Sequence, residues 1–268
     1  MKQKRYLKVR YILLGFFAVL LLLSGVFMRL GGFSTGEAAN VEAFQEYAQP
    51  VEKLTIPEGK KIIALGEATH GNAEFQQLKL DVFKKMVEDY HVRAFALEGD
   101  YGGCEQVNRY IHGGDGTAQE AAAEIGFAIY RTEEMAKLIS YMREYNAGAA
   151  AGNDIRFYGF DMQRVSHTFR FLMEACMELN IGTTRLEQLV DEEKLNPAFD
   201  FSTQEEILTQ AKDALNTSTA SEQVMHCADM LLQYCQLQSI PSSDGGAVRD
   251  RFMAENVKWI LQQEQSRG

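Results

Sequence analysis

The sequence predicts an α/β fold in which helices surround a parallel-sheet core, with a helical section after it and one transmembrane helix ahead of it. Three observations lead to this fold class. Short apolar runs alternate with longer segments of helical periodicity between residues 61 and 160. After residue 166, all of the longer apolar patterns repeat with the helical period. The run Tyr11–Met28 contains no charged residue in 18 positions, which is about the minimum length that crosses a bilayer.

Three short apolar runs are predicted to be the strands of the sheet. They are Lys61–Leu65, Arg93–Leu97 and Ile155–Phe160. The segment Glu74–Tyr90, between the first two runs, repeats apolar residues at helical spacing. Because a helix of this length suits a right-handed crossover, the first two strands are expected to be parallel neighbours in one sheet.

The other periodic segments are predicted to be helices. Thr117 and Glu120 have the spacing of a capping box, and so do Ser202 and Glu205. Pro241–Gly246 is expected to form a loop before the last helix. The predicted helices are Val41–Val51, Glu74–Tyr90, Gln106–Ile111, Thr117–Ile125, Glu133–Asn146, 166–180, 186–194, 204–215, 221–238 and Ala247–Gln263.

The charge distribution divides the chain into four parts. Residues 1–10 are a basic tail, residues 11–28 an anchor, residues 29–40 a linker, and residues 41–268 the folded domain. Five basic residues precede the apolar run and one follows it, which predicts a single-pass cell-membrane protein with a cytoplasmic tail and an extracytoplasmic domain. The alternative is a cleaved signal peptide with a weak site at Gly36–Ala39, which would make the domain a secreted one.

The composition after residue 30 bears on partners and on redox chemistry. This part carries 21 basic against 37 acidic residues, so it repels phosphate backbones and is not expected to bind nucleic acid. The spacings of Cys104, Cys176, Cys227 and Cys235 match no zinc or redox motif. Cysteines of an exported chain can form disulfides, but small buried thiols are the simpler interpretation here.

Polar side chains follow each of the three predicted strands. Glu67 and His70 follow the first strand, Glu98 and Asp100 the second, and Asp161 the third. Because the carboxyl ends of parallel strands meet at one edge of a sheet, these side chains are expected to converge on a cleft. An imidazole beside carboxylates is a typical general base near neutral pH, so the cleft is a candidate hydrolytic site.

These groups also have other interpretations. A single histidine after a strand often serves only as a hydrogen-bonding group, and acidic residues at strand ends often cap helices. Glu67, His70, Glu98 and Asp161 could instead hold a metal ion, although the sequence contains no HExxH motif. The motifs GxGxxG, GxxxxGKS/T and GxSxG are absent as well, so neither a nucleotide site nor a serine nucleophile is expected.

A set of ordered motifs sharpens this prediction. The string LGEATHGNAEF at Leu65–Phe75 resembles the signature of the erythromycin esterase family, hydrolases that open macrolide lactones. The likeness continues through FALE at Phe95–Glu98, FYGFD at Phe157–Asp161 and RDRFMAENVKW at Arg249–Trp259. It therefore covers roughly residue 41 to the end of the chain.

The resemblance implies an esterase that needs no metal or other cofactor. In such an enzyme His70 would activate water, and Glu67 and Glu98 would orient that base or bind the reacting group. Lys79 stands at a basic position of the first crossover helix, where it would stabilise the developing oxyanion or bind substrate. Asp161 and Arg249 are the other expected substrate-binding residues. Arg249 shares one helix face with Met253 and Asn256, and that face could reach the cleft or simply be solvated.

The resemblance also implies a further strand with a histidine after the last helix. The chain ends at Gly268, just after that helix, so residues 41–268 are expected to be a C-terminally short domain of this type. The other histidines, His91, His112, His167 and His226, lie in no matching motif and are expected to be structural.

The leading hypothesis is hydrolysis of a carboxylic ester or macrolide lactone, with a small-molecule ester as substrate and a role in antibiotic resistance. A truncated, non-catalytic ligand-binding homologue is one alternative, and a metal-dependent hydrolase on the same scaffold is the other.

Overall fold

The computed structural model describes residues 41–67, 69–191 and 194–267. The chain divides into two compact units, Met1–Leu54 and Thr55–Gly268. The described part of the first unit contains helix α2 (Val41–Tyr47) and the 3-10 helix η1 (Val51–Lys53). The predicted tail, membrane segment and linker, residues 1–40, lie outside the described residues. Within the described ranges, no helix is both long and apolar enough to span a membrane.

The second unit has a small parallel sheet at its centre, which confirms the α/β class. Strand β1 (Ala94–Asp100) pairs with β2 (Arg156–Asp161), with Phe95 opposite Phe157. Helices make up most of this unit and provide most of its core. Those that precede β1 or connect it to β2 are α3 (Ala73–Tyr90), α4 (Tyr101–Ile111), α5 (Ala118–Glu124), η2 (Ala128–Tyr130) and α6 (Glu133–Gly148).

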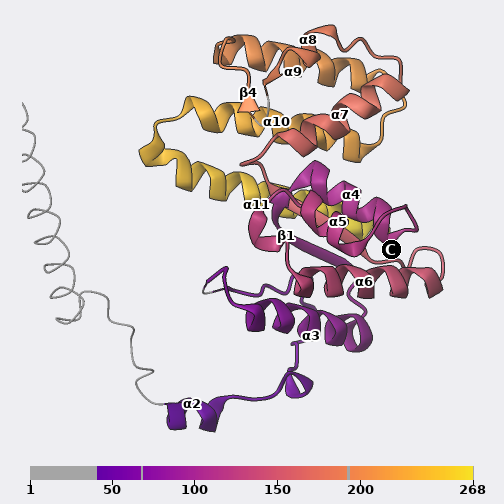
Figure 1. Ribbon diagram of the computed structural model, residues 1–268, viewed down its shortest axis with the longest axis vertical. Coiled ribbons are helices and arrows are strands. Elements are labelled where there is room, and N and C mark those ends of the chain that lie inside the picture. The colour runs from indigo at the N-terminus through magenta and orange to yellow at the C-terminus, as the bar shows by residue number, and fades with distance from the viewer. Residues whose placement is uncertain (1–40, 68, 192–193, 268) are drawn as a thin grey trace, which may run out of the picture. The chain divides into compact units, whose positions relative to one another are not determined.

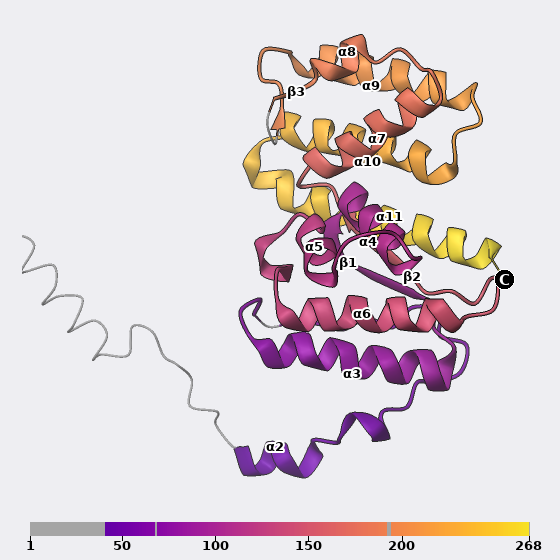
Figure 2. The same ribbon diagram turned by 45° about the vertical axis from the view of Figure 1, so that its right-hand side comes forward.

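The helices around the sheet pack in layers. Strand β1 lies between α6 on one side and α4 with α5 on the other, and α3 lies beyond α6 (Figures 1 and 2). The apolar faces of these helices and of β1 and β2 form one core cluster, which includes Phe83, Leu97, Val107, Met142 and Phe157. Burying such apolar surface is the main force that holds a sheet this small in place.

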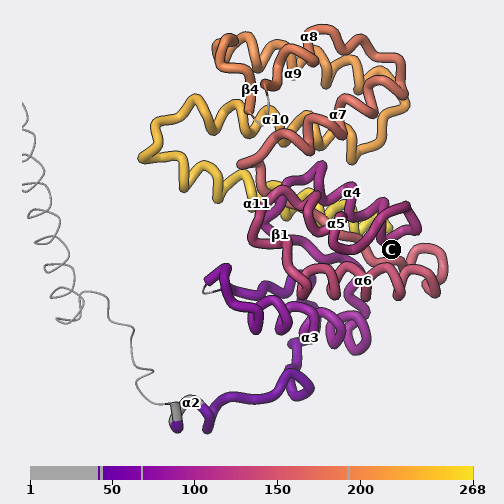
Figure 3. The backbone as a smooth tube through the Cα atoms, viewed as in Figure 1, coloured from indigo at the N-terminus to yellow at the C-terminus, as the bar shows by residue number. Residues whose placement is uncertain are grey.

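A helical section follows β2 and has a core of its own. Leu172, Leu208 and Leu231 are fully buried in this second cluster. From α10 the chain enters the long helix α11, which returns from the helical section to contact β2 (Figure 3). The helices of this section are α7 (Ser166–Glu178), α8 (Thr184–Glu187), α9 (Phe201–Asn216), α10 (Glu222–Ser239) and α11 (Ser242–Ser266).

The predicted strand at Lys61–Leu65 is wrong. These residues have no regular secondary structure, and no backbone hydrogen bond among the described residues joins them to β1. Ile62 is 52% exposed and Leu65 is 47% exposed. An apolar run becomes a strand only when a neighbouring strand pairs with its backbone groups, and this run has no such partner among the described residues.

Several helices also differ from the prediction: α2 ends at Tyr47 rather than Val51, and α4 begins at Tyr101 rather than Gln106. The segment 186–194 is not a helix, because α8 ends at Glu187 and an antiparallel hairpin of β3 (Val190–Asp191) and β4 (Lys194–Leu195) follows. The amide of Asn196 donates to the carbonyl of Leu189 at 2.7 Å, a non-local bond that local periodicity does not reveal.

The predicted loop at Pro241–Gly246 is instead the beginning of α11. Pro241 takes the N-cap position, where a helix needs no backbone N–H from it, and Asp244 in the first turn favours the helix dipole. The capping box of Thr117 and Glu120 is confirmed, but the one predicted at Ser202 and Glu205 is wrong. Asp200 caps α9 instead by accepting the backbone N–H of Thr203 at 2.8 Å.

The four cysteines are buried and unpaired, which confirms that they act as small apolar side chains. Cys104 and Cys227 have no exposed surface at all. Burial raises the pKa of both thiols well above its usual value, so they are unreactive in the folded protein.

Candidate active site

Glu67 lies in the turn before α3, where two side chains of that helix hold its carboxylate. Lys79 Nζ lies 2.7 Å from Glu67 Oε2, and Gln76 Nε2 donates to Oε1 at 3.1 Å. Lys79 also donates to the Gln76 side-chain oxygen at 3.2 Å, so the three groups form a closed network. Gln76 and Lys79 are three residues apart and therefore share one helix face. We call these three residues the Glu67 cluster.

His70 stands beside this cluster and is open to solvent. Its side chain is 56% exposed, and its Nδ1 atom lies 3.7 Å from Glu67 Oε2. That distance is too long for a hydrogen bond but close enough for attraction once the ring is protonated. The ring has no hydrogen bond to any residue that the structure describes, so both of its nitrogens are available to water.

Arg249 reaches from α11 to the carboxyl ends of both strands. Its Nε donates to Asp161 Oδ1 at 3.1 Å, and its Nη2 donates to Asp161 Oδ2 at 2.8 Å and to Glu98. Asp161 is completely buried and also accepts the backbone N–H of Gln163. Burial by itself lowers the pKa of the guanidinium, but its bonds to Asp161 and Glu98 outweigh this effect and raise the pKa. Arg249, Asp161 and Glu98 form the Arg249 cluster.

Tyr130 lies near residues of both the Glu67 cluster and the Arg249 cluster. Its side chain is buried, and Lys79 Nζ lies 5.7 Å from the centre of its ring. Burial raises the pKa of its hydroxyl, and the negative charges of Glu98 and Glu67 raise this pKa further. The Tyr130 hydroxyl therefore lies near both Glu67 and Glu98, two carboxylates that are far apart in the sequence. Sequence reasoning missed this residue, because η2 lies between two helices and follows no strand.

The structure separates some residues that the sequence suggested would act together. Glu98 contacts Arg249 and has no contact with His70 among the described residues. Asp100 lies opposite Asp161 in the sheet, but its side chain bonds to no member of either cluster and instead caps α4 by accepting the backbone N–H of Gly103 at 3.0 Å. The hydroxyl of Thr168 donates to the same carboxylate oxygen at 2.8 Å, so Asp100 has a structural role.

Helix α11 is fixed beside β2 by a buried amide pair. Asn256 donates to the carbonyl of Phe160 at 3.1 Å and exchanges two hydrogen bonds with Gln233 of α10. Phe252 and Ile260 on the same helix are buried in the core. Asn256 therefore belongs to neither cluster, but it fixes the helix that brings Arg249 to the strand ends.

The other four histidines lie in structural surroundings. His226 is buried and stacks on Trp259 with ring centres 3.9 Å apart, and burial lowers its pKa to about 3. His112 bonds the carbonyl of Asn108 and the carboxylate of Asp154. His167 lies 3.1 Å from Glu124, and His91 caps the end of α3 with a positive φ of 57°.

The carboxylates of both clusters are engaged by cations of the chain itself. Lys79 neutralises Glu67, and Arg249 neutralises Asp161 and Glu98. Over the part of the chain that the structure describes, no three His, Cys, Asp or Glu side chains are arranged to hold a metal ion. This donor set therefore does not fit the metal site considered from the sequence.

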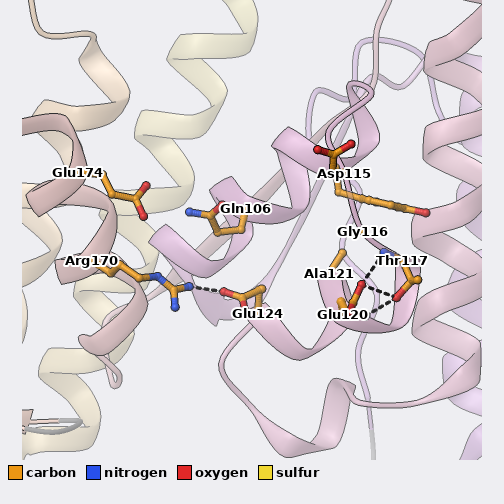
Figure 4. Close-up of a pocket in the computed structure, with 10 residues that line it drawn as sticks. Gln106, Asp115, Gly116, Thr117, Glu120, Ala121, Glu124, Arg170 and Glu174 are labelled. Carbon is orange, nitrogen blue, oxygen red and sulfur yellow. Dashed lines mark hydrogen bonds and ion pairs between the residues drawn. The ribbon is translucent and has the colours of Figure 1, made fainter. Parts of the chain in front are cut away.

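A separate hollow of about 430 Å³ opens between α4, α5 and α7 (Figure 4). It is rich in acidic groups, and three of its four carboxylates have local partners among the described residues. Glu124 pairs with Arg170, Glu174 pairs with Arg109 at 3.0 Å, and Glu120 accepts bonds from Thr117. None of the site residues predicted from the sequence lines this hollow.

Comparison with known proteins agrees with this fold. The family model for erythromycin esterase matches residues 87–268. A putative hydrolase, YbfO, from Bacillus subtilis (strain 168) is 26% identical over 163 residues, which cover 60% of this chain and 31% of the relative. Erythromycin esterase type II from Escherichia coli is 33% identical over 104 residues, which cover 39% of this chain and 24% of the relative.

A crystal structure of a Bacillus cereus protein has the same fold. It superposes with a TM-score of 0.59 and 22% identity, covering 74% of this chain and 53% of the other. The chain thus spans only 31% and 24% of the lengths of the two curated relatives. It spans 53% of the length of the Bacillus cereus protein in the crystal structure. The matched family region includes Glu98, Asp161 and Arg249, and it starts after Glu67 and His70. Since the family model covers more than half of the sequence, the chain belongs to the erythromycin esterase family.

Proposed function

We propose that the protein hydrolyses a carboxylic ester, either an open-chain ester or a macrolide lactone, at a site formed by His70 together with the Glu67 and Arg249 clusters. The observation that carries this proposal is the solvent-accessible His70 imidazole, placed 3.7 Å from a carboxylate that two side chains hold in position. A neutral imidazole is the most suitable protein base near neutral pH.

In the proposed reaction, His70 takes a proton from a water molecule as the water oxygen attacks the ester carbonyl carbon. The carbonyl electrons move to the carbonyl oxygen and give a tetrahedral oxyanion. When this intermediate collapses, the bond to the alcohol oxygen breaks, and the imidazolium returns its proton to that oxygen. The negative charge of Glu67 stabilises the imidazolium between these two steps.

Arg249 is the proposed oxyanion donor. Its Nη1 nitrogen has no hydrogen-bond partner among the residues that the structure describes, while Nε and Nη2 are held by Asp161 and Glu98. A cation fixed in advance beside the reacting carbon stabilises developing charge without reorganising. We assign Lys79 a second role, in which it holds the Glu67 carboxylate in position close to His70.

The names of the relatives support a hydrolase. One is a putative hydrolase and another an erythromycin esterase, although each is far longer than the region that it shares with this chain. Ring opening of a macrolide, and with it a role in antibiotic resistance, is therefore part of the proposal. So is the location, in which residues 11–28 anchor the domain outside the cell membrane or direct its secretion.

The second candidate function is ligand binding without catalysis. The observation that favours it is the 3.7 Å gap between His70 and Glu67, which leaves the imidazole without a hydrogen bond to orient it. A site of this kind would bind an ester and release it unchanged.

A panel of fluorogenic esters and a macrolide separates the two candidates. We expect hydrolysis by the purified protein, unchanged by a chelator and reduced by about 10²–10⁴-fold in His70→Ala, the usual contribution of a general base. His91→Asn is the matched control, because His91 is exposed and asparagine tolerates its positive φ. Saturable binding of an ester without turnover would favour the second candidate, and equal activity in His70→Ala would exclude His70 as the base.

A further inference from the structure

A groove of about 410 Å³ runs along the free side of β1. One wall is the segment 60–65, and the other walls come from β1 and from the facing sides of α3 and α11. Most of the lining is apolar, including Phe83 and Met86 of α3 and Val257 and Ile260 of α11. The groove lies next to the candidate active site, because Lys79 of the Glu67 cluster is one of the residues that line it.

The β1 wall of the groove is an open strand edge. The backbone N–H of Arg156 donates to the carbonyl of Arg93 at 2.8 Å. In a parallel ladder the paired residues alternate, so Arg93, Phe95 and Leu97 face β2. The backbone groups of Ala94 and Ala96 must then face the groove. Ala96 is exposed in the middle of β1, which is unusual for a strand with helices packed around it.

The opposite wall has unpaired backbone groups as well. In the described ranges, no backbone–backbone hydrogen bond involves residues 60–66. This wall also exposes the apolar side chains of Ile62 and Leu65. The groove therefore has unpaired backbone groups on both sides, on segment 60–65 and on the open edge of β1. A β-strand placed between them can form hydrogen bonds to both walls.

The charges at one end of the groove are unbalanced. Lys60 and Lys61 line this end and form no ion pair with any described residue. The carboxylate of Glu264, which lines the groove too, is already engaged by the Tyr158 hydroxyl at 2.6 Å and by Arg267. An occupant that carries acidic residues at this end would complement the two free lysines.

We propose that this groove is a binding site for an extended peptide of a separate polypeptide, apolar along its length and acidic at its amino end. The peptide lies parallel to β1 and forms hydrogen bonds to the edge at Ala94 and Ala96 on one side and to residues 61–65 on the other. An aliphatic ligand could fill the same space, but it would leave both backbone edges unpaired. The proposal does not depend on ester hydrolysis.

Fluorescence anisotropy with a labelled synthetic peptide tests this proposal on the purified chain. The probe has seven alternating valine and isoleucine residues, the length of β1, with aspartates at its amino end. We expect saturable binding, and binding at least about tenfold weaker when alternate backbone amides are N-methylated, because each lost hydrogen bond costs roughly 1 kcal/mol. Hydrogen exchange should slow at the amides of Ala94, Ala96 and residues 61–65 in the complex.

Matched protein variants locate the site. Ala96→Glu places a charge in the groove without disturbing the core, and it should abolish binding. Ala147→Glu changes an alanine that is equally exposed but lies at the end of α6, and it should bind normally. Lys61→Glu should weaken binding of the peptide whose aspartates are at the amino end, and it should not weaken binding of a peptide without them.

Four results would overturn the proposal. Equal binding of the N-methylated and unmodified peptides would show that backbone hydrogen bonds play no part in binding. Displacement of the probe by palmitate as effectively as by unlabelled peptide would mark a lipid site. Self-association that Ala96→Glu abolishes, without any peptide binding, would mark the groove as an interface between copies. No binding of the probe to the folded chain would leave the groove without a peptide ligand.

Discussion

Replacing Arg249 with methionine removes the centre of the Arg249 cluster and little else. Methionine keeps a long apolar side chain at this position of α11 but has no guanidinium. Asp161, which is completely buried, then loses hydrogen bonds of 3.1 and 2.8 Å and keeps only the bond from the backbone N–H of Gln163. Glu98 also loses its partner, but its side chain is 40% exposed and water can replace the guanidinium there.

The size of the effect follows from this difference in burial. A hydrogen bond from a charged group to a buried carboxylate contributes about 1.5–3 kcal/mol. The exposed contact to Glu98 contributes about 0–1 kcal/mol, as is usual for surface ion pairs. We therefore expect Arg249→Met to lower the free energy of unfolding by about 3–5 kcal/mol, as for other ion pairs with one buried partner left uncompensated.

Urea denaturation measures this change, with fluorescence of the single tryptophan, Trp259 of α11, as the signal. Arg251→Met is the matched control, because Arg251 is 63% exposed and pairs with Glu255 only at 3.9 Å, so a change within about 0.5 kcal/mol is expected. Adding Asp161→Asn to Arg249→Met should recover part of the loss, because it removes the unpaired charge. A loss below about 1 kcal/mol, or no recovery in the double variant, would refute this account of the cluster.

Three further predictions concern the rest of the fold. Burial raises the pKa of Glu105 from 4.5 to about 7. The folded protein therefore binds the Glu105 proton more tightly than the unfolded chain does, and the stability that this proton contributes at low pH is lost as the pH rises through 7. Glu105→Gln should flatten the fall in unfolding free energy between about pH 5 and 8 in urea titrations. Gly103→Ala should lower the thermal midpoint and cost about 1–3 kcal/mol or more, because its Cβ would lie 1.8 Å from the carbonyl oxygen of Glu124. Gly148→Ala meets nothing within 4 Å and is the control. Asn256→Leu should cost about 2–4 kcal/mol in urea denaturation by leaving Gln233 and the Phe160 carbonyl unpaired, and a cost below about 1 kcal/mol would contradict that role.

Elements with strong local signals were predictable. Helix α3 follows its apolar periodicity, and the capping box of Thr117 and Glu120 begins α5 at the predicted residue. Strands β1 and β2 were predicted within three residues of their ends at Asp100 and Asp161. In each of these cases the residues that decide the conformation lie within a few positions of one another.

Site residues that depend on distant partners were predictable only in part. Arg249 follows from its motif, but its bonds to Asp161 and Glu98 span 88 and 151 positions of the chain. The geometry also revealed Gln76, which fixes Glu67, and Tyr130, which follows no strand. Their importance comes from neighbours that only the folded chain brings together.

By itself, the sequence determined the α/β class, the two segments that form β1 and β2, and the acidic residues at their carboxyl ends, but it predicted the wrong partner for β1. Periodicity, capping and chain order are local properties, so they can be read from neighbouring residues. The tertiary structure decided that Lys61–Leu65 forms no strand, since a strand exists only through a partner's backbone. It also decided how the charges pair, with Glu98 bound to Arg249 and His70 left open to solvent beside Glu67. Ion pairs depend on distances across the fold, and no spacing along the chain encodes them.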